Sequence, residues 1–147
     1  MKKFRFPLHS VAIQRKLREG EKRERFAAAV RASAEAESAL QVIQHRIAEL
    51  ETVIARERSG TFQPAAQTGF LQALRDEQAL QAEAVKQVAK AKAAAEVARQ
   101  AWIESRRDVR LIETLETKAR AVHRHEFERE EQALLDDRTN ALAARAG

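Results

Sequence analysis

The chain contains no cysteine and no tyrosine, and it has only four glycines and two prolines among its 147 residues. Without cysteine it forms no disulfide and offers no thiolate for catalysis, which is typical of a protein from a reducing compartment. Apolar runs are short as well: the stretch Val11–Ile13 is too brief for the apolar segment of a secretion signal. No run of about 18 apolar residues is present, so we expect a soluble, cytoplasmic protein.

Alanine, glutamate, arginine, glutamine and leucine dominate instead, and 33% of the residues are charged. This composition is typical of long helices and coiled coils, whose large surface keeps many charges in water. Lys and Arg number 27 against 22 Asp and Glu, which gives a net charge of +5. The excess is small, so the distribution of charge along the chain is more informative than its sum.

The few helix breakers divide the chain in two. Pro7 stands near the start, most of the others lie in SGTFQPAAQTG (59–69), and residues 72–146 contain neither glycine nor proline. We therefore predict one domain over residues 1–147, with a helix over about 7–58, a turn over 59–69 and a helix over about 70–138. The tail beyond 138 is expected to fray.

Three residues near these boundaries have predicted roles. Gly60 is expected to end the first helix in the left-handed conformation, and Thr68 to cap the second helix. Gly20 lies inside the first helix, where a glycine costs roughly 1 kcal/mol relative to alanine and is tolerated.

Both predicted helices carry a stripe with the alternating three- and four-residue steps of a coiled coil. A single helix cannot bury such a stripe. We therefore predict an all-α fold in which two long helices form an antiparallel coiled-coil hairpin, pairing residue i with about 128 − i. The second stripe is richer in alanine and is predicted to slip by one position after Ile112. The first stripe comprises Phe26, Ala29, Ser33, Ala36, Leu40, Ile43, Ile47, Leu50 and Ile54; the second comprises Leu74, Glu77, Gln81, Ala84, Val88, Ala91, Ala95, Ala98, Trp102, Ser105, Val109 and Ile112, then Leu115, Ala119 and Val122.

The hairpin pairing brings two kinds of charge together near the chain termini. Lys2, Lys3 and Arg5 fall near the acidic run HEFEREE (125–131), so opposite charges are expected to hold the terminal segments together. Slightly inward, basic residues face one another, which is unfavourable in an isolated hairpin and predicts a docking site for an acidic partner. This basic collar consists of Arg15, Lys16, Arg18, Lys22, Arg23, Arg25, Arg106, Arg107 and Arg110.

Patterns that carry catalysis or metal binding are not found. His123 and His125 are two residues apart, so on a helix they point about 200° apart and cannot chelate one ion. The acidic pairs at 130–131 and 136–137 lie on a solvated helix with no pocket to shift a pKa. The sequence has no phosphate-binding glycine loop and no nucleophile motif. We expect no metal, no cofactor and no enzymatic activity.

The aromatic residues and the basic N-terminus leave alternatives open. Trp102, Phe26 and Phe127 are expected to fill the helix seam. Phe62 and Phe70 flank the turn and either pin it or, with Leu71 and Leu74, form an exposed docking patch. The first 25 residues hold nine Lys and Arg, as in a basic leucine zipper, but a turn interrupts the heptads that such a DNA reader needs.

The start FRFPLHSVAIQRKLREGEKR (4–23) resembles the N-terminus of the FliJ family, small coiled-coil proteins of flagellar type III export. The likeness continues through the Ala-rich first helix, the turn in mid-chain and the late segment LIETLETKAR (111–120). That segment approximates a Leu-Glu-x-Leu-x-x-Lys/Arg pattern of the family.

This resemblance implies a non-enzymatic stalk, similar to the coiled coil of the rotary ATPase γ subunit. Its end with both termini is expected to enter the hexameric ring of the flagellar export ATPase and promote its assembly. The resemblance also implies links to the membrane export gate protein and to substrate chaperones, at the inner face of the cell membrane. No nucleic acid is expected.

By analogy with the family, two sets of residues are expected to bind these partners. The ring-binding set is Phe4, Phe6, Leu8, Val11, Arg15, Lys16, Arg18, Arg120, Arg124, Arg129 and Arg138; the gate- or chaperone-binding set is Phe70, Leu71 and Leu74.

Three alternative interpretations remain. They are a stalk protein of a virulence type III secretion system, an unrelated coiled-coil scaffold and a basic-helix nucleic-acid binder.

Overall fold

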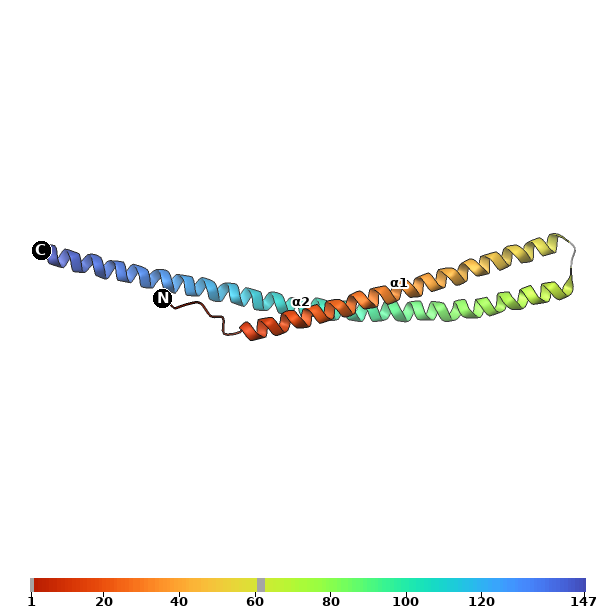
Figure 1. Cartoon of the computed structure of the whole chain (residues 1–147), viewed down its shortest axis with the longest axis horizontal. Coiled ribbons are helices and arrows are strands. Elements are labelled where there is room, and N and C mark those ends of the chain that lie inside the picture. The colour runs from red at the N-terminus through yellow and green to blue at the C-terminus, as the bar shows by residue number, and fades with distance from the viewer. Residues whose placement is uncertain (1, 61–62) are drawn as a thin grey trace. The chain divides into compact units, whose positions relative to one another are not determined.

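The computed structural model describes residues 2–60 and 63–147, which form two long α-helices. Helix α1 spans His9–Ser59 and helix α2 spans Pro64–Ala146 (Figure 1). The described residues include no strand. The predicted all-α fold, an antiparallel hairpin of two long helices, is confirmed.

The chain divides into two compact units, and both helices contribute to each unit. Unit 1 combines Met1–Gly20 with Ile103–Gly147, and unit 2 comprises Glu21–Trp102. The turn lies in unit 2, whereas both ends of the chain lie in unit 1.

Contacts across unit 2 show that its two helix segments run antiparallel. The Phe26 and Trp102 rings stack with centroids 5.5 Å apart and planes 16° apart. Further toward the turn, Lys92 Nζ lies 3.0 Å from a Glu37 carboxylate oxygen. The partner numbers fall as the α1 numbers rise, close to the predicted pairing. All nine positions of the first predicted stripe are buried or half-buried, so that stripe is the seam of unit 2.

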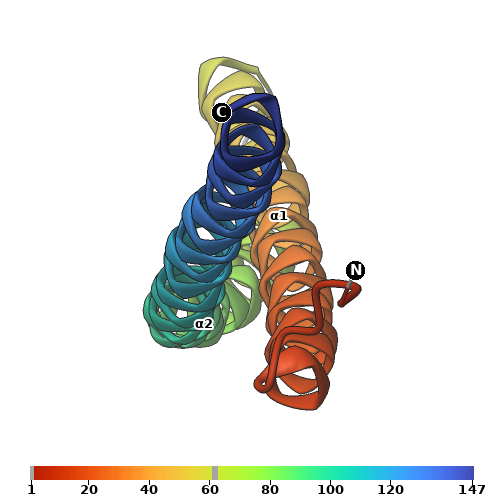
Figure 2. The ribbon, with the colours of Figure 1, turned by 90° about the vertical axis from the view of Figure 1, so that its left-hand side faces the viewer.

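Unit 1 pairs the start of α1 with the later part of α2. Ala12, Ser105 and Ile112 are its buried residues, and Ile112 is only 2% exposed. Arg15 Nη1 donates a hydrogen bond of 3.2 Å to the Asp108 carbonyl oxygen. Residues 2–8 precede α1 as a mostly extended segment, which we call the strap (Figure 2).

The start of α2 differs from the prediction. The helix begins at Pro64, six residues before the predicted start, because proline fits the first turn of a helix, where its missing N–H is not needed. Thr68 is therefore not a cap. It lies inside the helix, and its Oγ1 donates a hydrogen bond of 2.9 Å to the Pro64 carbonyl oxygen.

The ends of both helices also differ from the prediction. None of the described glycines has a positive φ, so Gly60 does not end α1 in the left-handed conformation. Ser59 Oγ instead donates to the Arg56 carbonyl oxygen at 2.9 Å in the last turn. Helix α2 continues to Ala146, beyond the predicted 138, because alanine-rich sequence with no breaker favours helix. Phe62 lies outside the described residues.

The predicted one-residue slip of the second stripe is wrong. Leu115 and Val122 are 40% and 58% exposed, whereas the polar Glu116 and His123 are half-buried. An unbroken helix keeps its period of 3.6 residues, so the buried stripe continues through positions 116, 119 and 123 whatever residues occupy them.

Candidate functional site

The strap packs against α2 at the end of unit 1 that carries both chain termini. Together they line a groove of about 290 Å³, which we call the terminal groove. In Figure 1 the strap leaves the start of α1 and runs beside α2. The terminal groove is lined by Lys2, Phe4, Arg120, His123, Arg124 and Phe127.

Three contacts hold the strap in this groove, and two of them involve the Phe4 ring. Its ring meets the His123 ring edge to face, with centroids 5.4 Å apart. The Arg120 guanidinium lies over the Phe4 ring, 4.9 Å from its centroid, in a cation–π contact. His123 Nε2 lies 3.2 Å from the Lys2 carbonyl oxygen, within hydrogen-bond distance. The strap is thus held by one aromatic side chain and one backbone contact.

The lining of the terminal groove is basic and apolar, and no carboxylate lines it. Arg120 also forms an ion pair of 3.1 Å with Glu116, one turn earlier on α2. The strap lies beside residues 123–127, as the pairing predicts, because Lys2 lines the same groove as Phe127. The predicted ion pairs are not found: among the described residues, none joins Lys2, Lys3 or Arg5 to the glutamates at 126–131. Phe4 contacts the ring of His123 and the guanidinium of Arg120, so the strap lies against a basic turn of α2.

The remaining predicted ring-binding residues lie around this end of unit 1. Phe6, Val11 and Arg15 are half-buried, whereas Leu8, Lys16 and Arg18 are exposed. Arg15 bonds the Asp108 carbonyl oxygen, so it is partly engaged within the unit. Arg129 and Arg138 lie on the part of α2 beyond the strap, where every residue from 128 to 147 is exposed. We call residues 128–147 the tail.

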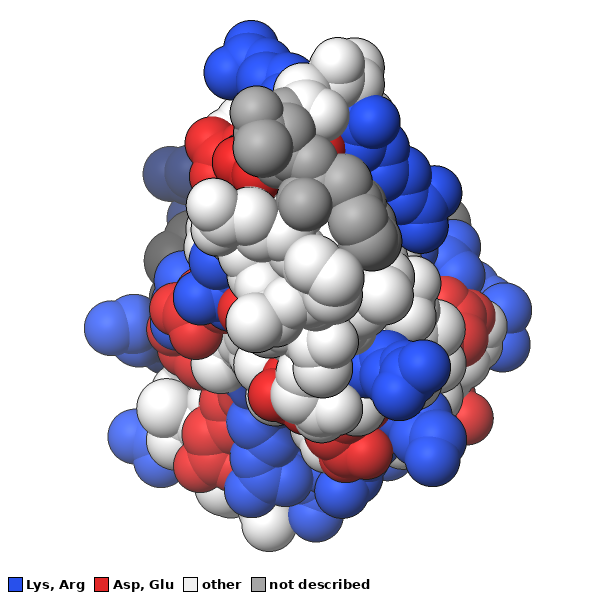
Figure 3. Space-filling model, turned by 90° about the vertical axis from the view of Figure 1, so that its right-hand side faces the viewer, with Lys and Arg blue, Asp and Glu red and all other residues white. Residues whose placement is uncertain are grey.

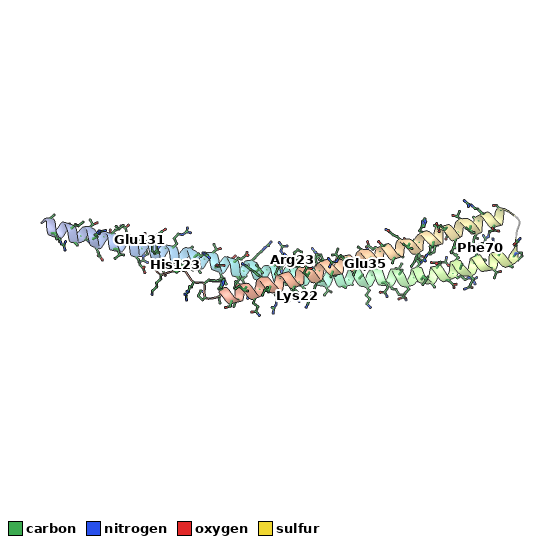
Figure 4. The ribbon with its side chains drawn as sticks, viewed as in Figure 1. Lys22, Arg23, Glu35, Phe70, His123 and Glu131 are labelled. Carbon is green, nitrogen blue, oxygen red and sulfur yellow. The ribbon has the colours of Figure 1, made fainter. Side chains whose placement is uncertain are left out.

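The basic collar is divided between the two units. Arg15, Lys16, Arg18, Arg106, Arg107 and Arg110 belong to unit 1, and Lys22, Arg23 and Arg25 to unit 2. Within unit 1 the bond from Arg15 to Asp108 places basic residues of both helices side by side. Figure 4 marks Lys22 and Arg23 on α1 and His123 on α2. The part of the collar in unit 1 therefore includes basic residues from both helices.

The second predicted set lies near the turn of unit 2. Phe70, Leu71 and Leu74 are half-buried on the first turns of α2, so part of each side chain is available to a partner. The middle of the face that carries the turn is largely uncharged, with Lys and Arg as well as Asp and Glu toward its margins (Figure 3). A groove of about 500 Å³ lies further along this unit. It is lined by Arg46, Glu49, Leu50, Val53, Ala73, Asp76 and Glu77.

The described residues offer little for catalysis or metal binding. Among them, no group of three His, Asp or Glu is placed to hold a metal ion. The pKa of Glu96 is lowered, first by the hydrogen bond from Gln100 and then by the Arg99 charge, but Glu96 lies on the surface. Neither helix, over the residues described, is long and apolar enough to cross a membrane.

Sequence reasoning missed the terminal groove as a unit. It placed Phe4, Arg120 and Arg124 at this end of the molecule but assigned His123 to the surface and Phe127 to the seam. The predicted pairing of residue i with about 128 − i already placed Phe4 opposite residue 124, so it pointed to this part of α2. What it lacked was the burial of His123, which follows from the true course of the second stripe.

Comparison with known proteins gave one match. The family model described as "Flagellar FliJ protein" matches residues 4–147, nearly the whole chain. Neither the curated proteins nor the solved structures gave a match. The matched range includes the strap residue Phe4, both helices and the tail. The chain therefore belongs to the FliJ family of flagellar, export-related proteins.

Proposed function

We propose that this protein is a non-enzymatic stalk of the flagellar type III export apparatus. It acts in the cytoplasm, at the inner face of the cell membrane, where it binds the hexameric export ATPase and promotes its assembly and activity. The observation that carries the proposal is the family match over residues 4–147. The flagellar description of that family favours the flagellar system over a virulence system.

The end of unit 1 with both termini is the part proposed to enter the ATPase ring. Its exposed tail, terminal groove and basic residues offer charge and apolar surface without any catalytic group. Such a stalk needs no reaction of its own, because an asymmetric shaft inside a symmetric ring makes the surrounding ATPase subunits inequivalent. The proposed ring contacts are the residues of the predicted set, from Phe4 to Arg138.

The turn end of unit 2 is proposed to meet the membrane export gate protein and substrate chaperones. Phe70, Leu71 and Leu74 present half-buried apolar side chains there, and the middle of the face that carries the turn is largely uncharged (Figure 3). Hot spots of protein interfaces are typically aromatic and aliphatic side chains set in partly desolvated surroundings. This end is chemically unlike the basic end of unit 1, which suits two different partners.

The test measures ATP hydrolysis and ring assembly by the export ATPase of the same organism, with and without this protein. We expect the protein to stimulate hydrolysis and to shift the ATPase toward hexamers. Lys16→Glu with Arg18→Glu should weaken the stimulation at least about tenfold, because two exposed charges are reversed at the ring contact. The matched control is Lys86→Glu with Lys90→Glu, two exposed lysines of α2 in unit 2.

Circular dichroism separates binding from folding in this experiment. Both double variants should keep the helicity of the parent, because all four residues are exposed on helices. A full-length protein that neither stimulates the ATPase nor changes its oligomeric state would contradict the proposal. Loss of helicity in the Lys16/Arg18 variant would show that these residues support the hairpin rather than the ring contact.

A further inference from the structure

Unit 1 carries two surfaces of opposite charge on one continuous helix. The terminal groove presents Lys2, Arg120, His123 and Arg124 around the rings of Phe4 and Phe127. The tail that follows presents Glu130, Glu131, Asp136 and Asp137 around two leucines. Figure 4 marks His123 and Glu131, one from each surface, on α2. The tail holds five acidic and three basic residues, whereas no acid is among the described residues that line the groove.

The tail has an exposed apolar stripe that no other described part of the chain covers. Leu134, Leu135 and Leu142 are 69%, 56% and 61% exposed. Leu134 comes seven residues after Phe127, and seven residues on a helix return to nearly the same side. The stripe of the tail thus continues the face that lines the terminal groove. A helix with this pattern normally buries such a stripe against another helix.

The two surfaces cannot satisfy each other within one molecule. Arg124 and Leu134 lie on the same unbroken helix, ten residues apart, so they are held about 15 Å from each other. No glycine or proline between residues 70 and 146 allows the tail to fold back. Their complementarity is therefore available only to a second molecule.

We propose that two copies of this chain associate through the terminal groove and the tail. The contact is antiparallel and two-fold symmetric, so the tail of each copy lies against the terminal groove of the second copy. With the Phe127 rings near the symmetry axis, Arg124 of one copy lies opposite Glu130 of the second copy. The same register places the Arg120 stem of one copy against Leu134 of the second copy, where the arginine methylenes cover apolar surface.

The register gives a charge-swap test by sedimentation equilibrium over about 1–500 μM protein. Arg124→Glu and Glu130→Arg should each raise the dissociation constant of the dimer at least about tenfold, because each places like charges together twice. The double variant Arg124→Glu/Glu130→Arg should restore it to within about threefold of the parent, since the pair is merely exchanged. Leu134→Asn should also weaken the dimer.

Matched controls change the same charges elsewhere. Lys86→Glu and Glu51→Arg alter exposed residues of unit 2 and should leave the dissociation constant unchanged. Raising NaCl from about 50 to 500 mM should weaken the parent dimer about tenfold, because exposed charges are screened. A protein that stays monomeric throughout overturns the proposal. The proposal is also overturned if neither single reversal changes the dissociation constant of the dimer. A double variant that dimerises no more tightly than either single variant overturns it as well.

The association has one consequence that rests on the proposed function. Phe4, Arg120 and Arg124 belong both to this interface and to the proposed ring-binding set, so a dimer cannot enter the ring. The sedimentation experiment contains no ATPase, so its result stands whether or not the ring contact exists. With the ATPase added, self-association and ring binding should compete.

Discussion

At the scale of single residues, unit 2 has one stacked aromatic pair in the part of its seam where the neighbouring side chains are small. Phe26 and Trp102 stack 5.5 Å apart across the two helices. Most neighbouring positions of the second stripe are alanines, which bury little area each. The stacked pair therefore contributes more to this part of the hairpin than any neighbouring alanine contact.

Phe26→Ala should lower the free energy of unfolding by about 2–3 kcal/mol, because it removes a half-buried ring and its stacking partner's contact. Phe26→Leu keeps most of the apolar area and should cost less. Urea denaturation followed by circular dichroism measures both changes, and the fluorescence of Trp102 reports on its surroundings. Equal stability of the alanine variant and the parent would contradict a structural role for the stack.

Glu96 provides a residue-scale prediction for pH. Gln100 Nε2 donates to its carboxylate at 3.0 Å, and Arg99 forms an ion pair with it at 3.2 Å. The Gln100 hydrogen bond is the main cause that lowers the pKa of Glu96. A lowered pKa means that the contact stabilises the fold above the unfolded-state pKa and that this stabilisation is lost as pH falls through the folded-state pKa.

NMR titration of the side chain should therefore give Glu96 a midpoint below that of an ordinary glutamate. Gln100→Ala removes the hydrogen bond and should move the midpoint upward. A midpoint that does not change in this variant would show that Arg99 alone holds the carboxylate in its charged form.

At the scale of elements, the length and continuity of the helices decide what the molecule presents. Helix α1 passes through Gly20 without a break, and α2 extends 83 residues to Ala146. The strap is the one described segment before α1, and Phe4 holds it to α2. Because α2 is longer than α1, its tail stays exposed and carries the unpaired leucines.

Gly20→Ala should stabilise the protein by about 0.5–1 kcal/mol. A glycine inside a helix leaves the unfolded chain more freedom than alanine does. A Cβ at Gly20 meets no atom within 4 Å, and its φ is not positive, so the added methyl group brings no clash or strain. Thermal denaturation measures the change, and a lower melting temperature would reveal a role for the glycine that this geometry does not show.

At the scale of the whole molecule, positive charge gathers on the paired segments of unit 1. Residues 2–20 hold six Lys and Arg against one Glu, and residues 103–125 hold six against four acids. These segments lie against each other within the unit, as the bond from Arg15 to Asp108 shows. Like charges held together oppose the folded state unless salt or an acidic partner screens them.

Raising NaCl from about 50 to 500 mM should therefore raise the melting temperature by about 2–4 °C, measured at low protein concentration. The surface ion pairs of unit 2, such as Lys92 with Glu37, are exposed and contribute little, so their screening should not reverse the sign. The variant Lys16→Glu/Arg18→Glu should show a smaller response to salt. A melting temperature that falls with salt would mean that ion pairs, not like-charge repulsion, dominate.

The sequence by itself determined the two helices, their antiparallel pairing and the seam of unit 2. It could do so because these features depend on local periodicity and on the absence of glycine and proline, which hold for any helix. The pairing placed Phe26 with Trp102 and Glu37 near Lys92, as the structure has them. The approximate place of the turn follows from the same local rules.

Only the tertiary structure decided the course of the second stripe and the place where the strap packs on α2. Apolar residues suggested a slip through Leu115 and Val122, but helix geometry kept Glu116 and His123 on the buried side. The half-buried His123 contacts Phe4, and both residues line the terminal groove. Contacts between residues about 120 positions apart follow from how two rigid helices and a short strap fit together, and no local pattern encodes that fit.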